Sequence, residues 1–168
     1  MTDNKRIAII GLGYVGLPLA VEFGKQRRTL GFDVNPSRIQ QLVNGKDITL
    51  EVNEETLAEA EHLHFSCDEK ALEECQIFIV TVPTPIDDAN RPNLAPIIRA
   101  SEMVGRHLKT DDIVIYESTV FPGCTEEICI PLLECESNLK CNKDFSVGYS
   151  PERISPGEGG KRLSEIIK

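Results

Sequence analysis

The sequence predicts an α/β fold of the doubly wound kind, in which a mainly parallel sheet carries helices on both faces. Short apolar runs rich in Ile, Val and Phe recur along the chain, and stretches with apolar residues at helical spacing lie between them. Strands that are apolar throughout are typical of parallel sheets whose two faces are covered. The chain has 168 residues, of which 40% are hydrophobic, and this is enough for one core.

Six apolar runs are predicted to be strands, and they lie at residues 6–10, 29–32, 63–65, 77–80, 113–116 and 145–149. Three stretches with helical spacing are predicted to be helices, and they lie at residues 14–26, 94–108 and 125–135. Pro96 suits the first turn of the second helix behind an Asn93 cap, and Thr125 would cap the third helix. Pro131 lies deep in the third helix, so we expect a kink or an early helix end there.

The chain is predicted to be one domain over residues 1–168, because it contains no internal repeat, low-complexity tract or flexible linker. Its last segment, residues 155–168, changes to Gly and Lys and stops on a short helical pattern without a further strand. We therefore expect a domain that is truncated at its carboxyl end.

The charge and the apolar pattern disfavour several classes of partner. With 18 Lys and Arg against 27 Asp and Glu, the formal charge of −9 argues against broad binding to nucleic acid or anionic membranes. No apolar run reaches the ~20 residues of a membrane-spanning helix, and no signal peptide is evident, so we expect a cytoplasmic protein. The six cysteines form no CxxC pair, and His62 and His64 have no third ligand at hand, so we expect reduced thiols and no metal site.

The first predicted strand leads into a glycine-rich turn. Gly11, Gly13 and Gly16 form the pattern G-x-G-x-x-G between that strand and a helix, and Tyr14 and Val15 lie inside it. Such glycines allow a tight turn, close approach of a pyrophosphate and close packing of the helix on the strand. The helix amino terminus favours an anion. An ordinary turn does not require three glycines in this register, so the motif predicts a Rossmann-type dinucleotide site made by these residues.

An acidic residue follows at the end of the second predicted strand. Asp33 lies 22 positions beyond Gly11, where a carboxylate can accept both hydroxyls of an adenosine ribose, so NAD is preferred to NADP. Arg38 is a further candidate for the cofactor site, and its positive charge would weaken that preference. The alternatives are that Asp33 is a turn residue before Asn35 and Pro36, and that Arg38 is a solvated helix residue.

Polar residues follow three later predicted strands, at the edge of the sheet where ligands of open α/β sheets collect. Thr84 follows the fourth strand, Ser118 and Thr119 follow the fifth, and Glu152 follows the sixth. These side chains are candidates for the nicotinamide end of the cleft. Loop residues of these types also cap turns or meet solvent, so the residues alone leave both interpretations open.

Four segments together resemble the amino-terminal domain of the UDP-glucose/GDP-mannose dehydrogenase family, and they are residues 10–20 (IGLGYVGLPLA), 82–85 (VPTP), 117–127 (ESTVFPGCTEE) and 148–157 (GYSPERISPG). Within the family, the sequence is most similar to the UDP-N-acetylglucosamine and UDP-N-acetylgalactosamine 6-dehydrogenases, which make aminouronic acids for surface polysaccharide. The resemblance implies an NAD-dependent enzyme that oxidises C6 of a UDP-sugar twice, through a thioester on a cysteine. A UDP-glucose enzyme and a free-standing NAD-binding regulatory module are the alternatives.

The resemblance also implies roles for individual residues. Thr84 and Thr119 would lie at the cofactor and catalytic cleft, and Glu152 would handle water and protons in thioester hydrolysis. Pro156 stands where UDP-glucose enzymes often have a second glutamate, which argues against a UDP-glucose role. The family's nucleophilic cysteine lies in a Gly-rich segment, and Cys124 is not in that setting. We therefore expect that this chain is inactive alone, that the central helix and the substrate domain lie outside it, and that the full-length protein is a homodimer.

Overall fold

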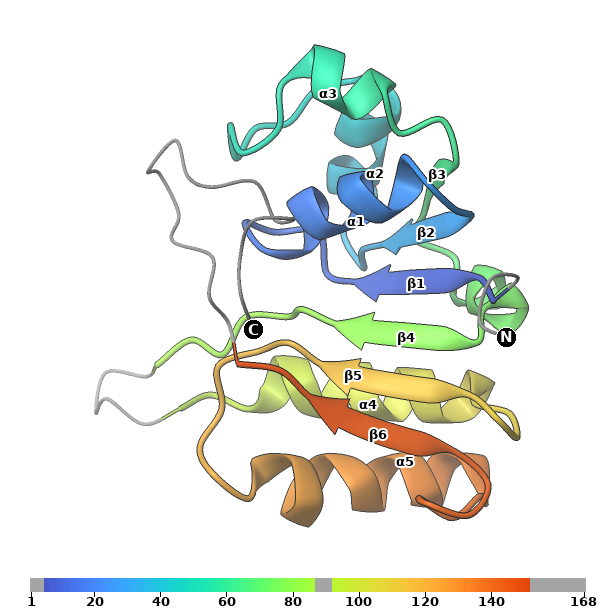
Figure 1. Cartoon of the computed structure of the whole chain (residues 1–168). Coiled ribbons are helices and arrows are strands. Elements are labelled where there is room, and N and C mark those ends of the chain that lie inside the picture. Colours follow the sequence, from blue (N-terminus) through green and yellow to red (C-terminus); the bar gives the residue numbers. More distant parts are fainter. Residues whose placement is uncertain (1–4, 87–91, 152–168) are drawn as a thin grey trace.

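The computed structural model describes residues 5–86 and 92–151, which form a six-stranded sheet with helices on both faces (Figure 1). All neighbouring strands are parallel, in the order β3-β2-β1-β4-β5-β6. The strands are β1 (Ile7–Ile10), β2 (Thr29–Phe32), β3 (Leu63–Ser66), β4 (Ile77–Val80), β5 (Ile113–Tyr116) and β6 (Ser146–Tyr149). Every predicted strand is confirmed to within one residue at either end, and so is the doubly wound α/β class.

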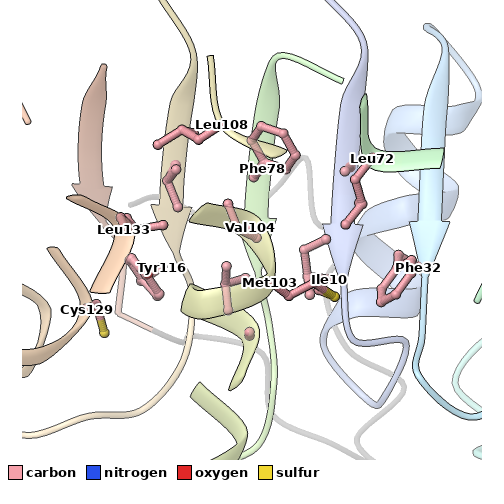
Figure 2. Packing of buried hydrophobic residues seen from close by; sticks show 14 of the residues in the cluster. Ile10, Phe32, Leu72, Phe78, Met103, Val104, Leu108, Tyr116, Cys129 and Leu133 are labelled. Carbon is pink, nitrogen blue, oxygen red and sulfur yellow. The ribbon is translucent and has the colours of Figure 1, made fainter. Parts of the chain in front are cut away.

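Alternate residues of the central strand β1 pack on opposite faces of the sheet. Ile7 and Ile9 belong to one buried cluster, which also contains residues of the first three α-helices. Ala8 and Ile10 belong to the other, in which Figure 2 shows Phe78 and its neighbours. β1, β2 and β4 are buried along their whole length, and β1 and β4 accordingly carry apolar side chains at every position rather than at alternate ones, whereas β2 also contains the buried Thr29 and Gly31.

The helices are α1 (Gly16–Gly24), α2 (Pro36–Val43), α3 (Glu54–Ala58), the 3₁₀ helix η1 (Glu69–Glu74), α4 (Ala95–His107), the π-helical turn η2 (Thr125–Cys129) and α5 (Ile130–Ser137). Of these, α1, α4 and the pair η2 and α5 confirm the three predicted helices. The other three are short, and each begins after an Asn or Asp whose side chain accepts backbone N–H groups. These capping residues are Asn35, Asn53 and Asp68.

Two predictions about helix starts are wrong in detail. The residue that precedes α4 is Leu94 rather than Asn93, although the Asn93 side chain accepts a hydrogen bond from Ala95 N at 3.0 Å. Thr125 does not cap the third predicted helix, because it lies inside the first turn, where Cys124 holds the cap position without a side-chain hydrogen bond.

The helix also does not end at Pro131. The π-helical turn η2 comes directly before α5, so that Pro131 falls in the first turn of a regular α-helix, where a missing N–H is tolerated. The wider turn thus accommodates the proline, and the helical segment continues to Ser137.

The arrows of β1, β2, β4, β5 and β6 point the same way in Figure 1, and β3 is parallel to β2, so the carboxyl ends of all six strands meet at one edge of the sheet. We call the loops that follow these ends the carboxyl edge. The strand order reverses between β1 and β4, because the chain adds β2 and β3 on one side of β1 and β4, β5 and β6 on the other. Ligands of doubly wound sheets bind at such a reversal. Among the residues that the structure describes, no helix is long and apolar enough to cross a membrane.

Candidate cofactor site

The glycine turn between β1 and α1 has the conformation that the motif predicts. Gly11 has a φ of +96°, which is accessible mainly to glycine, and its N–H donates to Phe32 O of β2 at 2.8 Å. A Cβ on Gly16 would lie 1.8 Å from Gly11 O and 2.4 Å from the Thr81 hydroxyl, so a side chain cannot fit there. These two glycines therefore let α1 start directly against the end of β1.

The next part of the turn is open. A Cβ on Gly13 would meet nothing within 4 Å. Within the described part of the chain, the N–H groups of Gly13, Tyr14 and Val15 donate to no carbonyl or side chain. Val15 holds the cap position of α1 without a side-chain hydrogen bond, and the first turn of α1 contains no acidic residue. Unpaired amides and the positive end of the helix dipole form a place for an anion such as a pyrophosphate.

Asp33 lies just beyond the end of β2 and contacts the glycine turn directly. Its Oδ2 accepts a hydrogen bond from Leu12 N at 2.9 Å, and its Oδ1 accepts one from Asn35 N at 2.9 Å. The carboxylate is half-buried and has acceptor capacity left for the hydroxyls of a ribose. The turn and cofactor interpretations of Asp33 are therefore compatible, because the turn holds the carboxylate beside the glycine loop.

Arg38 is not a solvated helix residue. It is 6% exposed, its Nε donates to Leu12 O at 2.9 Å, and its Nη1 lies 2.8 Å from Oδ1 of Asp47. Position 38 lies on the buried side of α2, which the helical spacing alone does not reveal. Leu12 is thus held at its N–H by Asp33 and at its carbonyl by Arg38, the two side chains that the sequence connects with the adenosine ribose.

Asp47 is a site residue that sequence reasoning missed. Its fully buried carboxylate accepts hydrogen bonds from the amides of Thr49, Glu51 and Val52 at 2.9–3.1 Å and from the Thr49 hydroxyl at 2.7 Å. Burial alone would raise the pKa of Asp47, but the hydrogen bonds from Thr49 and Val52 and the Arg38 guanidinium together lower it below the ordinary value. Asp47 is therefore an ionised, fully paired anion.

The carboxylate of Asp47 also fixes the shape of its own loop. Leu50 has a φ of +60°, a left-handed conformation that costs a non-glycine residue about 1–2 kcal/mol. The three amides bound to Asp47 come from the residues around Leu50, so they hold this turn in place. The aspartate followed two positions later by a threonine is the local sign of such a turn.

Thr81 is the second residue that sequence reasoning missed. It follows β4 directly, is buried, and donates its hydroxyl to Gly11 O at 2.8 Å and Ile10 O at 3.0 Å. A hydroxyl at the end of the fourth strand thus ties the glycine turn to the neighbouring strand across the point where the strand order reverses.

The loops after β4 and β5 are tied to each other by hydroxyl groups. Ser118 is buried and donates to Val82 O at 2.8 Å, and the Thr84 hydroxyl donates to Thr119 O. The side chain of Thr119 is exposed at the carboxyl edge. The structure therefore brings Thr84, Ser118 and Thr119 together, but it uses two of the three hydroxyls to connect the loops.

The last predicted site residue, Glu152, lies outside the described residues. The strand before it is described to its end, where Ser150 N donates to Tyr116 O at 2.9 Å. The Ser150 hydroxyl donates to Oε1 of the buried Glu117 at 3.1 Å. These contacts join the ends of β5 and β6 at the carboxyl edge.

The cysteines near the carboxyl edge differ in exposure: Cys67, which directly follows β3, is exposed, whereas the two cysteines at the start of the helical segment after β5 are buried. Cys124 and Cys129 are fully buried, and burial raises the pKa of Cys124 above the ordinary value and that of Cys129 to about 11. Nearby, the hydroxyls of Ser101 and Tyr116 form a buried hydrogen bond of 2.6 Å. None of the six cysteines forms a disulfide, as expected for reduced thiols. Within residues 5–86 and 92–151, no three potential metal ligands cluster.

Known proteins with the same arrangement can now be compared with this chain. Residues 5–166 match the NAD binding domain of the UDP-glucose/GDP-mannose dehydrogenase family. The chain is 57% identical over 166 residues to UDP-N-acetyl-D-glucosamine 6-dehydrogenase of Salmonella typhi, and the match covers 99% of this chain and 39% of that protein. It is 56% identical over 168 residues to the protein of the same name from Pseudomonas aeruginosa, with coverage of 100% and 40%.

A solved structure has the same fold. The GDP-mannose dehydrogenase from Pseudomonas aeruginosa, determined as a ternary complex, matches with a TM-score of 0.84 and 30% identity over 90% of this chain and 37% of that chain. The chain thus spans about 40% of the length of the curated relatives that it matches.

Proposed function

The chain belongs to the UDP-glucose/GDP-mannose dehydrogenase family as its NAD-binding domain, and from this premise we propose that the whole protein is a UDP-N-acetylglucosamine 6-dehydrogenase. It would oxidise C6 of the sugar to the uronic acid in two NAD-dependent steps, for the synthesis of surface polysaccharide. The identities of 57% and 56% to two enzymes of this name support the choice of substrate.

One observation carries the cofactor proposal. The turn at Gly13 has free amides and free space, and the Asp33 carboxylate is fixed beside it through Leu12. The amides of Gly13, Tyr14 and Val15 would bind the pyrophosphate, since they have no partner within the described residues. When bound, NAD supplies the hydride acceptor for the oxidation.

The Asp33 carboxylate would accept the hydroxyls of the adenosine ribose and disfavour a 2′-phosphate by its charge, so the cofactor would be NAD rather than NADP. Gly11 and Gly16 would allow the turn its tight shape, and Arg38 would hold the carbonyl side of Leu12. Asp33 would thus recognise the cofactor, whereas the two glycines and Arg38 would shape the turn beside it.

The loops after β4 and β5 would form the nicotinamide end of the site. Thr119 would face the cofactor and the substrate with its exposed side chain, whereas Thr84 and Ser118 would position the loops through their hydroxyls. From the family resemblance, Glu152 would act as the base for water in the hydrolysis of the thioester. The cysteine that carries the acyl group would come from the part of the relatives that this chain does not span, so the chain alone would not turn over a UDP-sugar.

The proposal for the whole protein has three further parts. Its substrate partner would be a UDP-sugar, and it would assemble as a homodimer, which light scattering on the full-length protein checks. It would act in the cytoplasm, where NAD and nucleotide sugars are both available, and cell fractionation checks this.

Calorimetric titration of the 168-residue chain with NAD and NADP tests the cofactor proposal. The wild type should bind NAD more tightly than NADP, and Asp33→Ser should reduce the ratio of the two affinities at least tenfold, or about 1.4 kcal/mol. Asp144→Ser is the matched control, because it removes the same charge from the loop before β6, at the opposite edge of the sheet from the glycine turn. Absence of NAD binding by the wild type, or an unchanged ratio in Asp33→Ser, would refute the assignment.

The activity needs the full-length protein. It should reduce NAD when given UDP-N-acetylglucosamine, as seen by the absorbance of NADH. A Glu152→Gln variant should retain the oxidations but release product slowly, because glutamine keeps the shape and lacks the base. Mass spectrometry should then detect a covalent sugar adduct on the protein, and normal turnover by the variant would exclude this role for Glu152.

A further inference from the structure

A buried ion pair lies behind the glycine turn, and nothing described so far explains why it is ionic. Arg38 and Asp47 approach to 2.8 Å with side-chain exposures of 7% and 0%. Apolar residues of similar volume can stabilise a fold as well as a buried pair does, so stability alone does not account for the two charges. The position of the pair points to the cofactor, because Arg38 also donates to Leu12 O.

We propose that Asp47 is a positioning residue that sets the preference for NAD over NADP by neutralising and anchoring Arg38. The inference rests on the proposed function, since it concerns the same site, and it assigns a role to a residue outside the glycine motif. Asp47 would act through Arg38 and would not touch the cofactor.

The charges around Leu12 carry the argument. Asp33 binds the N–H of this residue and Arg38 binds its carbonyl, so a carboxylate and a guanidinium flank one peptide unit next to the expected ribose. On its own, Arg38 would compensate Asp33 and offer a positive charge to a 2′-phosphate. With Asp47 paired to Arg38, the group of three has a net charge of about −1, and this charge repels a phosphate.

The geometry of Arg38 shows why its restraint matters. Its Nη1 and Nη2 are both buried and form no hydrogen bond among the described residues, and Nη1 contacts Asp47 as an ion pair at 2.8 Å, so the guanidinium has donors in reserve. The Asp47 carboxylate, in contrast, is saturated by Thr49, Glu51 and Val52 and cannot follow Arg38 if it moves. The fixed anion therefore keeps the guanidinium directed at Leu12 and away from other acceptors.

The test compares the affinities of NAD and NADP by calorimetric titration of the full 168-residue chain. Asp47→Asn retains the shape and removes the charge, and it should lower the ratio of NAD to NADP affinity about tenfold. Glu51→Gln is the matched control, because it also removes one negative charge, four positions after Asp47 in the chain. Unlike Asp47, the Glu51 carboxylate forms no ion pair within the described residues. Its ratio should change less than about twofold.

A second comparison separates action through Arg38 from a general effect. In an Arg38→Met background, adding Asp47→Asn should change the NAD to NADP ratio less than about twofold, as Glu51→Gln does, because the residue that Asp47 restrains is gone. An additive effect in this background would overturn the inference, and so would an unchanged ratio in Asp47→Asn or an equal fall in Glu51→Gln.

Asp47→Asn alone leaves a buried cation unpaired and could unfold the chain, which circular dichroism detects. The double variant has no unpaired buried charge, so its comparison with the wild type then decides the question. If Asp47 neutralises Arg38, removal of both residues should leave the NAD to NADP ratio within about twofold of the wild type, and a rise of about tenfold would show that Arg38 attracts a 2′-phosphate despite Asp47 and would overturn the inference. A wild type that binds no NAD would instead refute the proposed function, and this outcome is distinct from an unchanged ratio.

Discussion

The carboxyl edge has two halves, the loops after β1 and β2 and the loops after β4 and β5, and they use their polar groups in different ways. In the first half, the side chains of Asp33 and Arg38 bind the backbone of Leu12, while the amides of the following residues stay unpaired within the described part of the chain. In the second half, the hydroxyls of Thr84 and Ser118 donate to backbone carbonyls of the neighbouring loop. The first half thus presents backbone groups held by side chains, and the second half is two loops held to each other.

This difference bears on how binding sites in open α/β sheets are recognised. A site that binds through backbone amides needs side chains that hold its backbone in place. Here those side chains come from β2 and α2 and their loops, which lie outside the glycine motif. Polar side chains beside a site need not face the ligand, because unpaired backbone carbonyls in buried loops are unfavourable and require donors. Variants that change one group at a time test this difference between the two halves.

The largest expected effect is on the tight packing of the first half. Gly16→Ala would place a Cβ 1.8 Å from the carbonyl oxygen of Gly11, a backbone atom that cannot move aside. We expect a loss of about 3 kcal/mol in the free energy of unfolding, measured by urea denaturation. Gly148→Ala is the control, because its Cβ would meet only Ile115 Cγ1 at 3.9 Å. Equal losses in the two variants would show that α1 does not depend on this contact.

Gly13→Val should affect binding and leave the fold intact. The position is exposed and a Cβ there meets nothing within 4 Å, so urea denaturation should match the wild type. The added side chain would fill the space in front of the free amides, and we expect at least a 100-fold loss of NAD affinity by calorimetry, or about 2.7 kcal/mol. Unchanged affinity would mean that the open turn is not the binding surface.

The contrast between Asp47 and a second buried aspartate extends the comparison to the opposite edge of the sheet. Asp112 precedes β5, is 2% exposed, and accepts a hydrogen bond from Lys109 N at 2.8 Å. Burial raises its pKa to about 6. Unlike Asp47, it has no ion-pair partner among residues 5–86 and 92–151. A raised pKa in the folded state means that stability is present below pH 4 and is lost as the pH rises through about 6.

Asp112→Asn should therefore be more stable than the wild type at pH 7.5, on the order of 2 kcal/mol, and equal to it near pH 4. Asparagine retains an oxygen that can accept from Lys109 N. Asp111→Asn is the control, because it removes the same charge from an exposed neighbour and leaves the buried Asp112 carboxyl in place. Urea denaturation across this pH range gives the result, and a parallel pH profile for Asp112→Asn and the wild type would contradict the prediction.

The sequence predicts the strands and the glycine turn well because both depend on local requirements. β1 and β4 are buried on both faces and are apolar at every position, and Gly11 must adopt a positive φ. These conditions leave their mark within a few consecutive residues. The confirmed α1 follows from the same local pattern.

The parts that the sequence does not predict depend on contacts between distant segments. Thr81 reaches the glycine turn from 70 residues away, and its hydroxyl has no local feature that distinguishes it from any other threonine after a strand. Arg38 is a charged residue of a type that is usually exposed, yet Asp47 and Leu12 pair with it in the interior. The side chains that support a site therefore become visible only when the chain is folded.

The smallest expected effect separates two adjacent residues of the second half. Ser118 and Thr119 are both candidates for the cofactor site, but Ser118 is buried with its hydroxyl on Val82 O, and Thr119 is exposed. Ser118→Ala removes that donor and leaves a carbonyl without its partner, so the free energy of unfolding should fall by about 1 kcal/mol. Its NAD affinity should stay within about twofold of the wild type, because the methyl group keeps the loop filled.

Thr119→Ala should show the reverse pattern. Only its backbone carbonyl binds another loop, through the Thr84 hydroxyl, and alanine retains that carbonyl, so stability should change by less than about 0.5 kcal/mol. NAD affinity should fall severalfold if the exposed hydroxyl meets the cofactor as proposed. Urea denaturation gives the stability of each variant, and calorimetry gives its NAD affinity. We expect Ser118→Ala to lower the stability alone and Thr119→Ala to lower the affinity alone. Loss of affinity in Ser118→Ala without loss of stability would place the Ser118 hydroxyl on the cofactor, and the second half would then bind its ligand through side chains after all.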